Sequence, residues 1–256
     1  MLAQRLSAAT APSLKHLAAS FALALACAGL VFGLWYPAPY GELVGGRQLF
    51  LLIVAVDVVC GPLLTLVVWD SRKPRRELWR DIGAIVLIQL LALGYGMASA
   101  IQARPVFLAF EGNRFRVVSA PDVEMSELAQ APAELRRLGL SGPRLIGVRL
   151  AQPSDADFPS SIRLAMEGLH PAFRPGRWVD YGSQRPLVAA QAQPLSALRR
   201  KHPAHGARID AAAARAGRSE AELGYWPLTA GRHTDWVVVV DRREGMPRAF
   251  LPLDGW

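Results

Sequence analysis

The chain has 256 residues, of which 52% are hydrophobic, and a formal net charge of +8. Such a composition excludes a chain made only of membrane spans and is unusual for one that is entirely water-soluble, so a mixed architecture is expected. The part after residue 104 carries 20 Lys+Arg and 16 Asp+Glu without a concentrated basic patch, which argues against a nucleic-acid partner. The two cysteines, Cys27 and Cys60, fall in apolar stretches, so the last 150 residues contain neither a disulfide framework nor a cysteine metal site.

Three apolar stretches near the N-terminus predict membrane-crossing helices, over residues 17–36, 49–68 and 82–101. Each is close to the ~20 residues that cross ~30 Å of hydrocarbon. None shows the polar stripe of a helix in a water-soluble core. We therefore expect a membrane protein in which a bundle of three transmembrane α-helices (residues 1–104) precedes a soluble α+β domain (residues 105–256).

The first stretch has an alternative interpretation as a cleaved signal peptide. Arg5 and Lys15 supply a positive segment before it, and Ala24-Leu25-Ala26 has small residues at cleavage spacing. The apolar stretch continues past this point to Trp35 and Tyr36, which are typical of an interfacial belt at the end of a retained span. A retained anchor is the preferred interpretation.

Basic residues in the loops predict the orientation. The loop between the second and third spans carries Arg72, Lys73, Arg75, Arg76 and Arg80, whereas the preceding loop carries only Arg47. Because basic loops stay in the cytoplasm, the loop between the second and third spans and the N-terminus are both expected there. After three crossings of a bacterial inner membrane, residues 105–256 would lie in the periplasm.

Three polar side chains are expected at similar depths inside the membrane. At 1.5 Å per helical residue, Asp57, Gln89 and Tyr95 lie about 18, 12 and 21 Å from the cytoplasmic side. A carboxylate at such a depth should be neutral, paired or turned toward the bundle interior. A structural hydrogen bond from Asp57 to one of the other two and a docking or proton-sensing role both remain open.

The soluble domain is predicted from short-range patterns. Strands are expected at 106–110, 114–118, 144–150, 236–241 and 247–253, and helices at 121–130, 158–169, 193–201 and 207–216. In the helix at 158–169, Ser160 or Ser161 would form the cap, and Ile162, Met166 and Leu169 share one face. Residues 173–194 show little regular pattern.

No catalytic or cofactor motif is found in the sequence. G-x-S-x-G, P-loop, G-x-G-x-x-G and H-E-x-x-H patterns are missing. His202 and His205 are separated by Pro203, and no nearby carboxylate completes a metal set. We expect no cofactor, no metal and no enzymatic activity.

An ordered set of segments between residues 15 and 120 resembles the type IV pilin accessory protein family, the TfpX/TfpZ group. The segments are Trp35-Tyr36-Pro37-x-Pro39-Tyr40, Gly45-Gly46-x-x-Leu49-Phe50, Val56-Asp57-Val58-Val59-x-Gly61-Pro62-Leu63-Leu64-Thr65, Gln89-Leu90-x-Ala92-Leu93-x-Tyr95-Gly96 and Ala103-Arg104-Pro105-Val106. From residue 120 onward only length and general character match.

This resemblance implies an inner-membrane accessory factor that assists the assembly or surface display of a type IV pilin. The pilin, the lipid bilayer and possible inner-membrane pilus assembly machinery are the implied partners. The interfacial segment with Trp35, Tyr36, Pro37, Pro39 and Tyr40 would lie where a pilin leaves the bilayer, although these residues could equally serve to fix their own loop. A membrane-anchored periplasmic sensor or ligand-binding module is the alternative, and a membrane enzyme acting on lipid or peptide is a further one.

Overall fold

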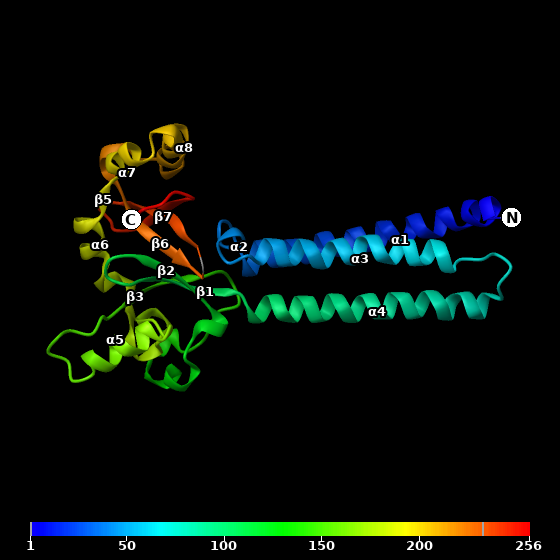
Figure 1. Ribbon diagram of the computed structural model, residues 1–256, viewed down its shortest axis with the longest axis horizontal. Coiled ribbons are helices and arrows are strands. Elements are labelled where there is room, and N and C mark those ends of the chain that lie inside the picture. Colours follow the sequence, from blue (N-terminus) through cyan, green and yellow to red (C-terminus); the bar gives the residue numbers. More distant parts are fainter. Residues whose placement is uncertain (1, 232) are drawn as a thin grey trace. The chain divides into compact units, whose positions relative to one another are not determined.

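The computed structural model describes residues 2–231 and 233–256, with the side chains of residues 2–6 and of Leu49 left outside that description. The side chain of Arg5, which was expected to belong to the positive segment before the first span, therefore lies outside the described part. The same holds for the side chain of Leu49, the first residue of the second expected span. The chain divides into two compact units, Met1–Arg104 and Pro105–Trp256 (Figure 1).

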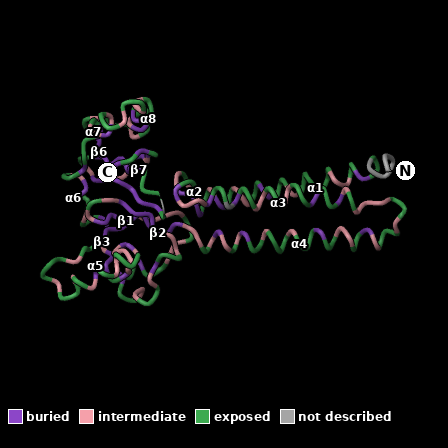
Figure 2. Tube along the Cα trace, in the orientation of Figure 1, coloured by how far each residue is buried: buried purple, intermediate pink, exposed green. Residues whose placement is uncertain are grey.

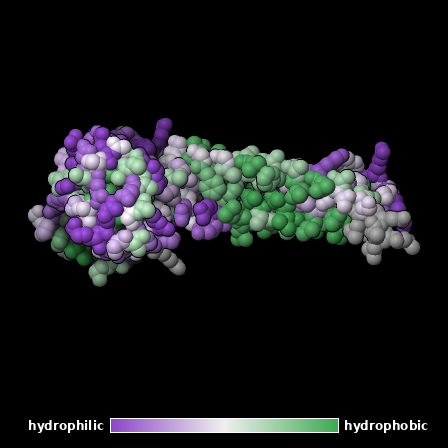
Figure 3. Space-filling view, turned by 90° about the horizontal axis from the view of Figure 1, so that it is seen from above, coloured by the Kyte–Doolittle hydropathy of each residue, from purple (hydrophilic) through white to green (hydrophobic). Residues whose placement is uncertain are grey.

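The first unit consists of long apolar helices. They are α1 (Leu2–Leu30), which continues as the wider π-helical turn η1 (Val31–Trp35), then the short α2 (Tyr40–Leu43), α3 (Gly46–Val68) and α4 (Arg75–Gln102). In the described residues, Ser7–Trp35, Gly46–Val68 and Arg75–Gln102 are long and apolar enough to cross a membrane. Apolar side chains cover the middle of this unit (Figure 3), and most of its trace is exposed or half-buried (Figure 2). The predicted order of three long apolar helices followed by a mixed helix and sheet unit is confirmed.

The second unit is built on a mixed sheet. Its strands are β1 (Pro105–Phe110), β2 (Phe115–Ser119), β3 (Arg144–Val148), β4 (Trp178–Asp180), β5 (Gln193–Pro194), β6 (Leu223–Ala230), β7 (His233–Asp241) and β8 (Pro247–Leu251). In the part of the chain that the structure describes, the strand order is β4-β3-β1-β2-β6-β7-β8, and β5 pairs with β6. The β1–β3 and β2–β6 pairs are parallel and the others antiparallel.

Helices cover the sheet at its two ends (Figure 1). They are α5 (Phe158–Met166), α6 (Arg185–Gln191), α7 (Leu195–Lys201) and α8 (Gly206–Ala216), accompanied by short 3-10 turns. One apolar core lies around β1 and β3, where Phe107 packs edge-on against Trp178 with ring centroids 4.6 Å apart. A second core joins β6–β8 to Leu198 of α7 and Ile209 of α8. Two cores along one sheet follow from the buried strand faces, which are rich in β-branched and aromatic residues.

Several local predictions need correction. Residues 120–130 form 3-10 turns and not a helix, and the strands and helix of 173–194 were not predicted. Helix α5 begins after Asp157, and neither Ser160 nor Ser161 caps it. Ser161 is instead buried, and its hydroxyl oxygen accepts a hydrogen bond from the Arg177 guanidinium at 2.8 Å.

Candidate functional site: a polar cavity among the apolar helices

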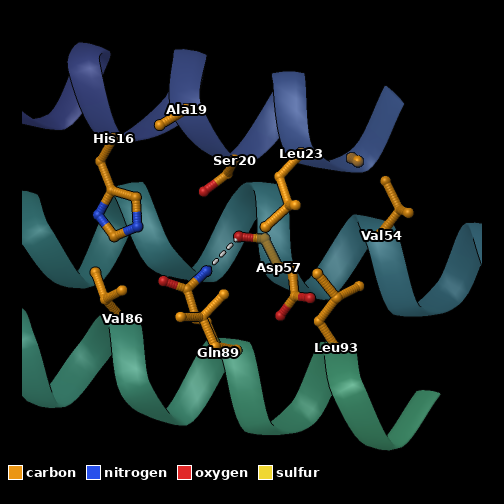
Figure 4. Close-up of a pocket in the computed structure, with 11 residues that line it drawn as sticks. His16, Ala19, Ser20, Leu23, Val54, Asp57, Val86, Gln89 and Leu93 are labelled. Atoms are coloured by element: carbon orange, nitrogen blue, oxygen red, sulfur yellow. Dashed lines mark hydrogen bonds between the residues drawn. The ribbon is translucent and has the colours of Figure 1, made fainter. Parts of the chain in front are cut away.

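A cavity of about 140 Å³ lies between α1, α3 and α4 (Figure 4). Most of its lining is apolar, from residues such as Leu23 and Leu93. The polar members are His16 and Ser20 from α1, Asp57 from α3 and Gln89 from α4. The cavity thus gathers polar groups from all three candidate spans, where each has few alternative partners.

The contact between α3 and α4 is a side chain to backbone hydrogen bond. Gln89 Nε2 donates to the backbone carbonyl of Asp57 at 2.8 Å (Figure 4). Gly61, one helical turn further on, makes this possible, because a Cβ there would lie 2.3 Å from the same Gln89 nitrogen. The predicted Asp57–Gln89 pair therefore exists, but it uses the Asp57 backbone and leaves the carboxylate free of this bond.

Two acceptor atoms of the site remain without a donor. Asp57 Oδ2 and Gln89 Oε1 are buried and have no hydrogen-bond partner among the described residues. A buried acceptor without a donor carries its full desolvation cost, which is repaid only when a donor arrives. The arrangement is suited to receiving a hydrogen-bond donor such as a hydroxyl, an amide, an ammonium group or water.

The first helix contributes an ionisable group that sequence reasoning missed. His16 Nδ1 lies 2.6 Å from Thr65 Oγ1 of α3, and Ser13 Oγ donates to the Pro62 carbonyl at 2.7 Å. His16 directly precedes the apolar stretch expected to begin at residue 17, but α1 begins earlier and includes it. A histidine next to an apolar stretch, at helical spacing from Ser13 and Ser20, was the available signal.

Tyr95 does not join the site, contrary to the expectation from depth. Its side chain is 78% exposed. Although its depth is similar to that of Asp57, it follows Gln89 by six residues and is therefore turned about 240° around the helix axis. Depth alone did not determine which face of α4 meets α3.

The interfacial aromatic segment packs into its own helical unit. Trp35 and Tyr36 belong to a buried cluster with Phe50 and Ala100, and the Tyr36 hydroxyl donates to the Ala100 carbonyl at 2.7 Å. Tyr40 is also buried. Trp35, Tyr36 and Tyr40 are therefore buried within their own unit, which is not what a direct contact with a pilin would require.

The remaining residues of that segment are more accessible. Pro37 and Pro39 are half-buried, and Pro39 lines a shallow hollow of about 260 Å³ together with Glu42 and Arg47. The observed packing supports the interpretation that the aromatic residues fix the loop. The accessible part of this segment is the stretch from Pro37 to Pro39.

The close approach of the Gln89 side chain to Gly61 gives a direct test of how α3 and α4 pack. Gly61→Val should displace the Gln89 amide and lower the amount of protein in the membrane fraction, because the added Cβ has no room. Asp57→Leu should leave the amount unchanged or raised, because it removes a carboxylate that costs ~2.5–3.5 kcal/mol at such a position. Immunoblots of membrane fractions measure both, with Gly94→Val as matched control, since a Cβ there meets nothing within 4 Å. Equal losses of protein in the two glycine variants would contradict the claim that Gly61 leaves the room that the Gln89 side chain needs.

No group of three or more His, Cys, Asp or Glu side chains that could hold a metal ion is found in residues 2–231 and 233–256.

Comparisons with known proteins identify proteins that are similar to this chain. The family described as "Fimbrial assembly protein FimB" matches residues 4–45. Fimbrial assembly proteins of Dichelobacter nodosus are similar along most of the chain: that of serogroup E1 is 35% identical and that of serogroup I 34%, each over 235 residues that cover 91% of both chains. The protein of serogroups C1 and C2 is 42% identical over 116 residues, which cover 45% of this chain and 88% of that one. No solved structure matches. Because the similarity extends through both compact units, the protein belongs to the fimbrial assembly protein family.

Proposed function

We propose that this protein is a non-catalytic accessory factor of type IV pilus biogenesis that assists the assembly or display of a cognate pilin. The observation that carries the proposal is the similarity to fimbrial assembly proteins over 91% of the chain. The ordered segments of residues 15–120 further support membership of the TfpX/TfpZ group of accessory proteins.

In this proposal the protein crosses the bacterial inner membrane three times. The N-terminus and the loop around Arg72 face the cytoplasm, and residues 105–256 lie in the periplasm. The exposed apolar side chains of the helices support the three crossings, and the basic loop supports the orientation. A pilin subunit held in the same membrane would then be accessible to both units.

The polar cavity supplies a contact within the membrane. A hydrogen-bond donor on the membrane helix of the pilin would satisfy Asp57 Oδ2 and Gln89 Oε1, the two buried acceptors without partners in the described residues. Because the gain depends on burial in an apolar surrounding, the contact would be lost once the pilin leaves the membrane. Such a contact suits a factor that holds subunits before or during assembly.

Deleting the gene tests the function. Surface pili should fall strongly while the total amount of pilin is unchanged, because the proposed role is in assembly and not in synthesis. Sheared surface pili and whole-cell pilin, both measured by immunoblot, separate the two quantities. The wild-type gene should restore display, whereas Asp57→Leu should restore the protein level only. Normal piliation of the deletion strain would refute the proposal.

A further inference from the structure

Helix α5 of the second unit presents its apolar side chains to solvent. Met166 is 83% and Ile162 47% exposed, whereas the one buried residue in α5 is the polar Ser161. The sequence pattern placed Ile162 and Met166 on a face with Leu169, which a domain core would be expected to cover. An exposed apolar helix face next to polar residues is typical of a protein interaction site.

Specific contacts hold α5 in this orientation. Arg177 is 3% exposed; its Nη2 donates to Ser161 Oγ at 2.8 Å and forms an ion pair with Asp157 at the start of α5. Because a buried guanidinium needs partners, Ser161 points inward to Arg177, which leaves Ile162 and Met166 on the exposed side of the helix. The outward apolar face is therefore a built feature of the unit.

This face forms one wall of a cleft of about 670 Å³. The opposite wall is the turn after β1, with Glu111 and Arg114, and the start of β2, with Arg116. The carboxylate of Glu111 is already used, since Oε2 accepts from Arg116 Nε at 3.0 Å and Oε1 from the Ala172 backbone N–H at 3.2 Å.

A net positive charge remains in the cleft. Arg114 Nε donates to Asn113 Oδ1 at 3.0 Å and lies 3.9 Å from Glu111 Oε2, and the guanidinium lies over the Trp256 ring, 4.8 Å from its centroid. Burial, and then the charge of Arg116, lower the pKa of His170, so this residue is neutral at neutral pH. Arg114 and Arg116 thus share the single carboxylate of Glu111, so one positive charge remains, and Arg114 has the longer of the two ion pairs.

We propose that this cleft binds a solvent-exposed segment of the pilin in which an apolar side chain stands next to a carboxylate. The apolar side chain would cover Met166 and Ile162, and the carboxylate would pair with Arg114. This inference rests on the proposed function for the identity of the partner. A second copy of this chain is the weaker occupant, because the unit has 20 Lys+Arg against 16 Asp+Glu and two such surfaces repel each other.

The test uses the full-length protein in cells that make pili. Met166→Glu and Arg114→Glu should each lower the pilin that co-purifies with the tagged chain by about tenfold, as expected for a central interface side chain. Met125→Glu and Arg200→Glu are the matched controls; Met125 is 57% exposed, Arg200 is exposed, and both lie outside the cleft. A photo-crosslinking amino acid at position 166 should capture pilin, and one at position 125 should not. Unchanged unfolding midpoints would show that the variants fold.

The outcomes separate this inference from the function on which it rests. If wild-type protein captures pilin and the cleft variants behave as their controls, the cleft is wrong and the accessory function stands. Crosslinks from position 166 to a second copy of this chain would overturn the pilin as occupant. If the wild-type chain captures no pilin and its deletion leaves piliation normal, the proposed function itself fails.

Discussion

Replacing Asp241 with alanine should destabilise the second unit by about 3 kcal/mol, a large share of the stability of a domain of this size. Asp241 is fully buried at the end of β7. Its Oδ2 accepts from Arg218 Nε at 2.9 Å, and its Oδ1 accepts from the backbone N–H groups of Arg243 at 2.8 Å and Glu244 at 3.2 Å. The substitution would leave these donors, which shape the β7–β8 turn, without their acceptor.

The expected pH dependence follows from the same contacts. Burial raises the pKa of Asp241, but the hydrogen bonds from Arg218 and the turn outweigh it and hold the pKa below its ordinary value. A carboxyl group whose pKa is lower in the folded state stabilises the fold above its unfolded pKa of about 4, and this stabilisation is lost as the pH falls further. The difference in stability between wild type and variant should therefore shrink below about pH 4.

Urea unfolding of the detergent-solubilised full-length protein, followed by tryptophan fluorescence, measures this free energy. Asp241→Asn retains an acceptor and should lose about half as much as alanine. The control is Asp235→Ala on the same strand, where the side chain is 68% exposed and the change should stay within about 0.5 kcal/mol. Equal effects at the two positions would contradict the assignment of Asp241 as the anchor of the turn.

Alkaline phosphatase fused after Trp256 should be active, and the same enzyme fused within residues 70–74 should be inactive. The reporter folds only outside the cytoplasm, so the expected contrast is nearly all or none. Arg72, Arg75, Arg76 and Arg80 are exposed, and Arg75 and Arg76 begin α4. Positive charge at a helix N-terminus opposes the helix dipole. These residues therefore do not stabilise the helix. Their presence is better explained if they keep the loop in the cytoplasm, as the proposed topology requires.

Two further fusions sharpen this test. A reporter at Val44, between η1 and α3, should be active, because in the proposed topology it lies on the same side as the C-terminus after one crossing. Replacing the five basic residues of the second loop with glutamine should reduce the contrast between the loop and C-terminal fusions. The reverse activity pattern in the unaltered protein would exclude the periplasmic assignment of residues 105–256.

The apolar helices could be predicted from sequence because length and composition define them almost independently of packing. The turn after β1 and the β7–β8 hairpin were also predictable, since Glu111-Gly112-Asn113 and Arg243-Glu244-Gly245 separate alternating or apolar stretches. Strand β6 was not predicted. It is buried along its whole length and so shows no alternation, and its Gly224 and Pro227 are unusual inside a strand.

The candidate site was predictable only in part. The charge of Asp57 and the polarity of Gln89 within apolar stretches marked the correct helices. The rotation of α4, the backbone acceptor and the inclusion of His16 depend on how three helices pack, which periodicity cannot give when the helices are apolar all round. The exposed position of Tyr95 could not be predicted for the same reason.

The position of β6 in the sheet has a consequence for the order of events during synthesis. Strand β2 pairs with β6, and the contact from Thr229 to the Phe115 carbonyl joins residues 114 positions apart. If the chain is exported from its N-terminus, β2 emerges long before β6, its second neighbour in the sheet, has been synthesised. The free edge of β2 is meanwhile open to strands of other polypeptides. A late-closing sheet of this kind folds slowly, and secretion-compartment chaperones would be expected to act on the nascent chain during that interval.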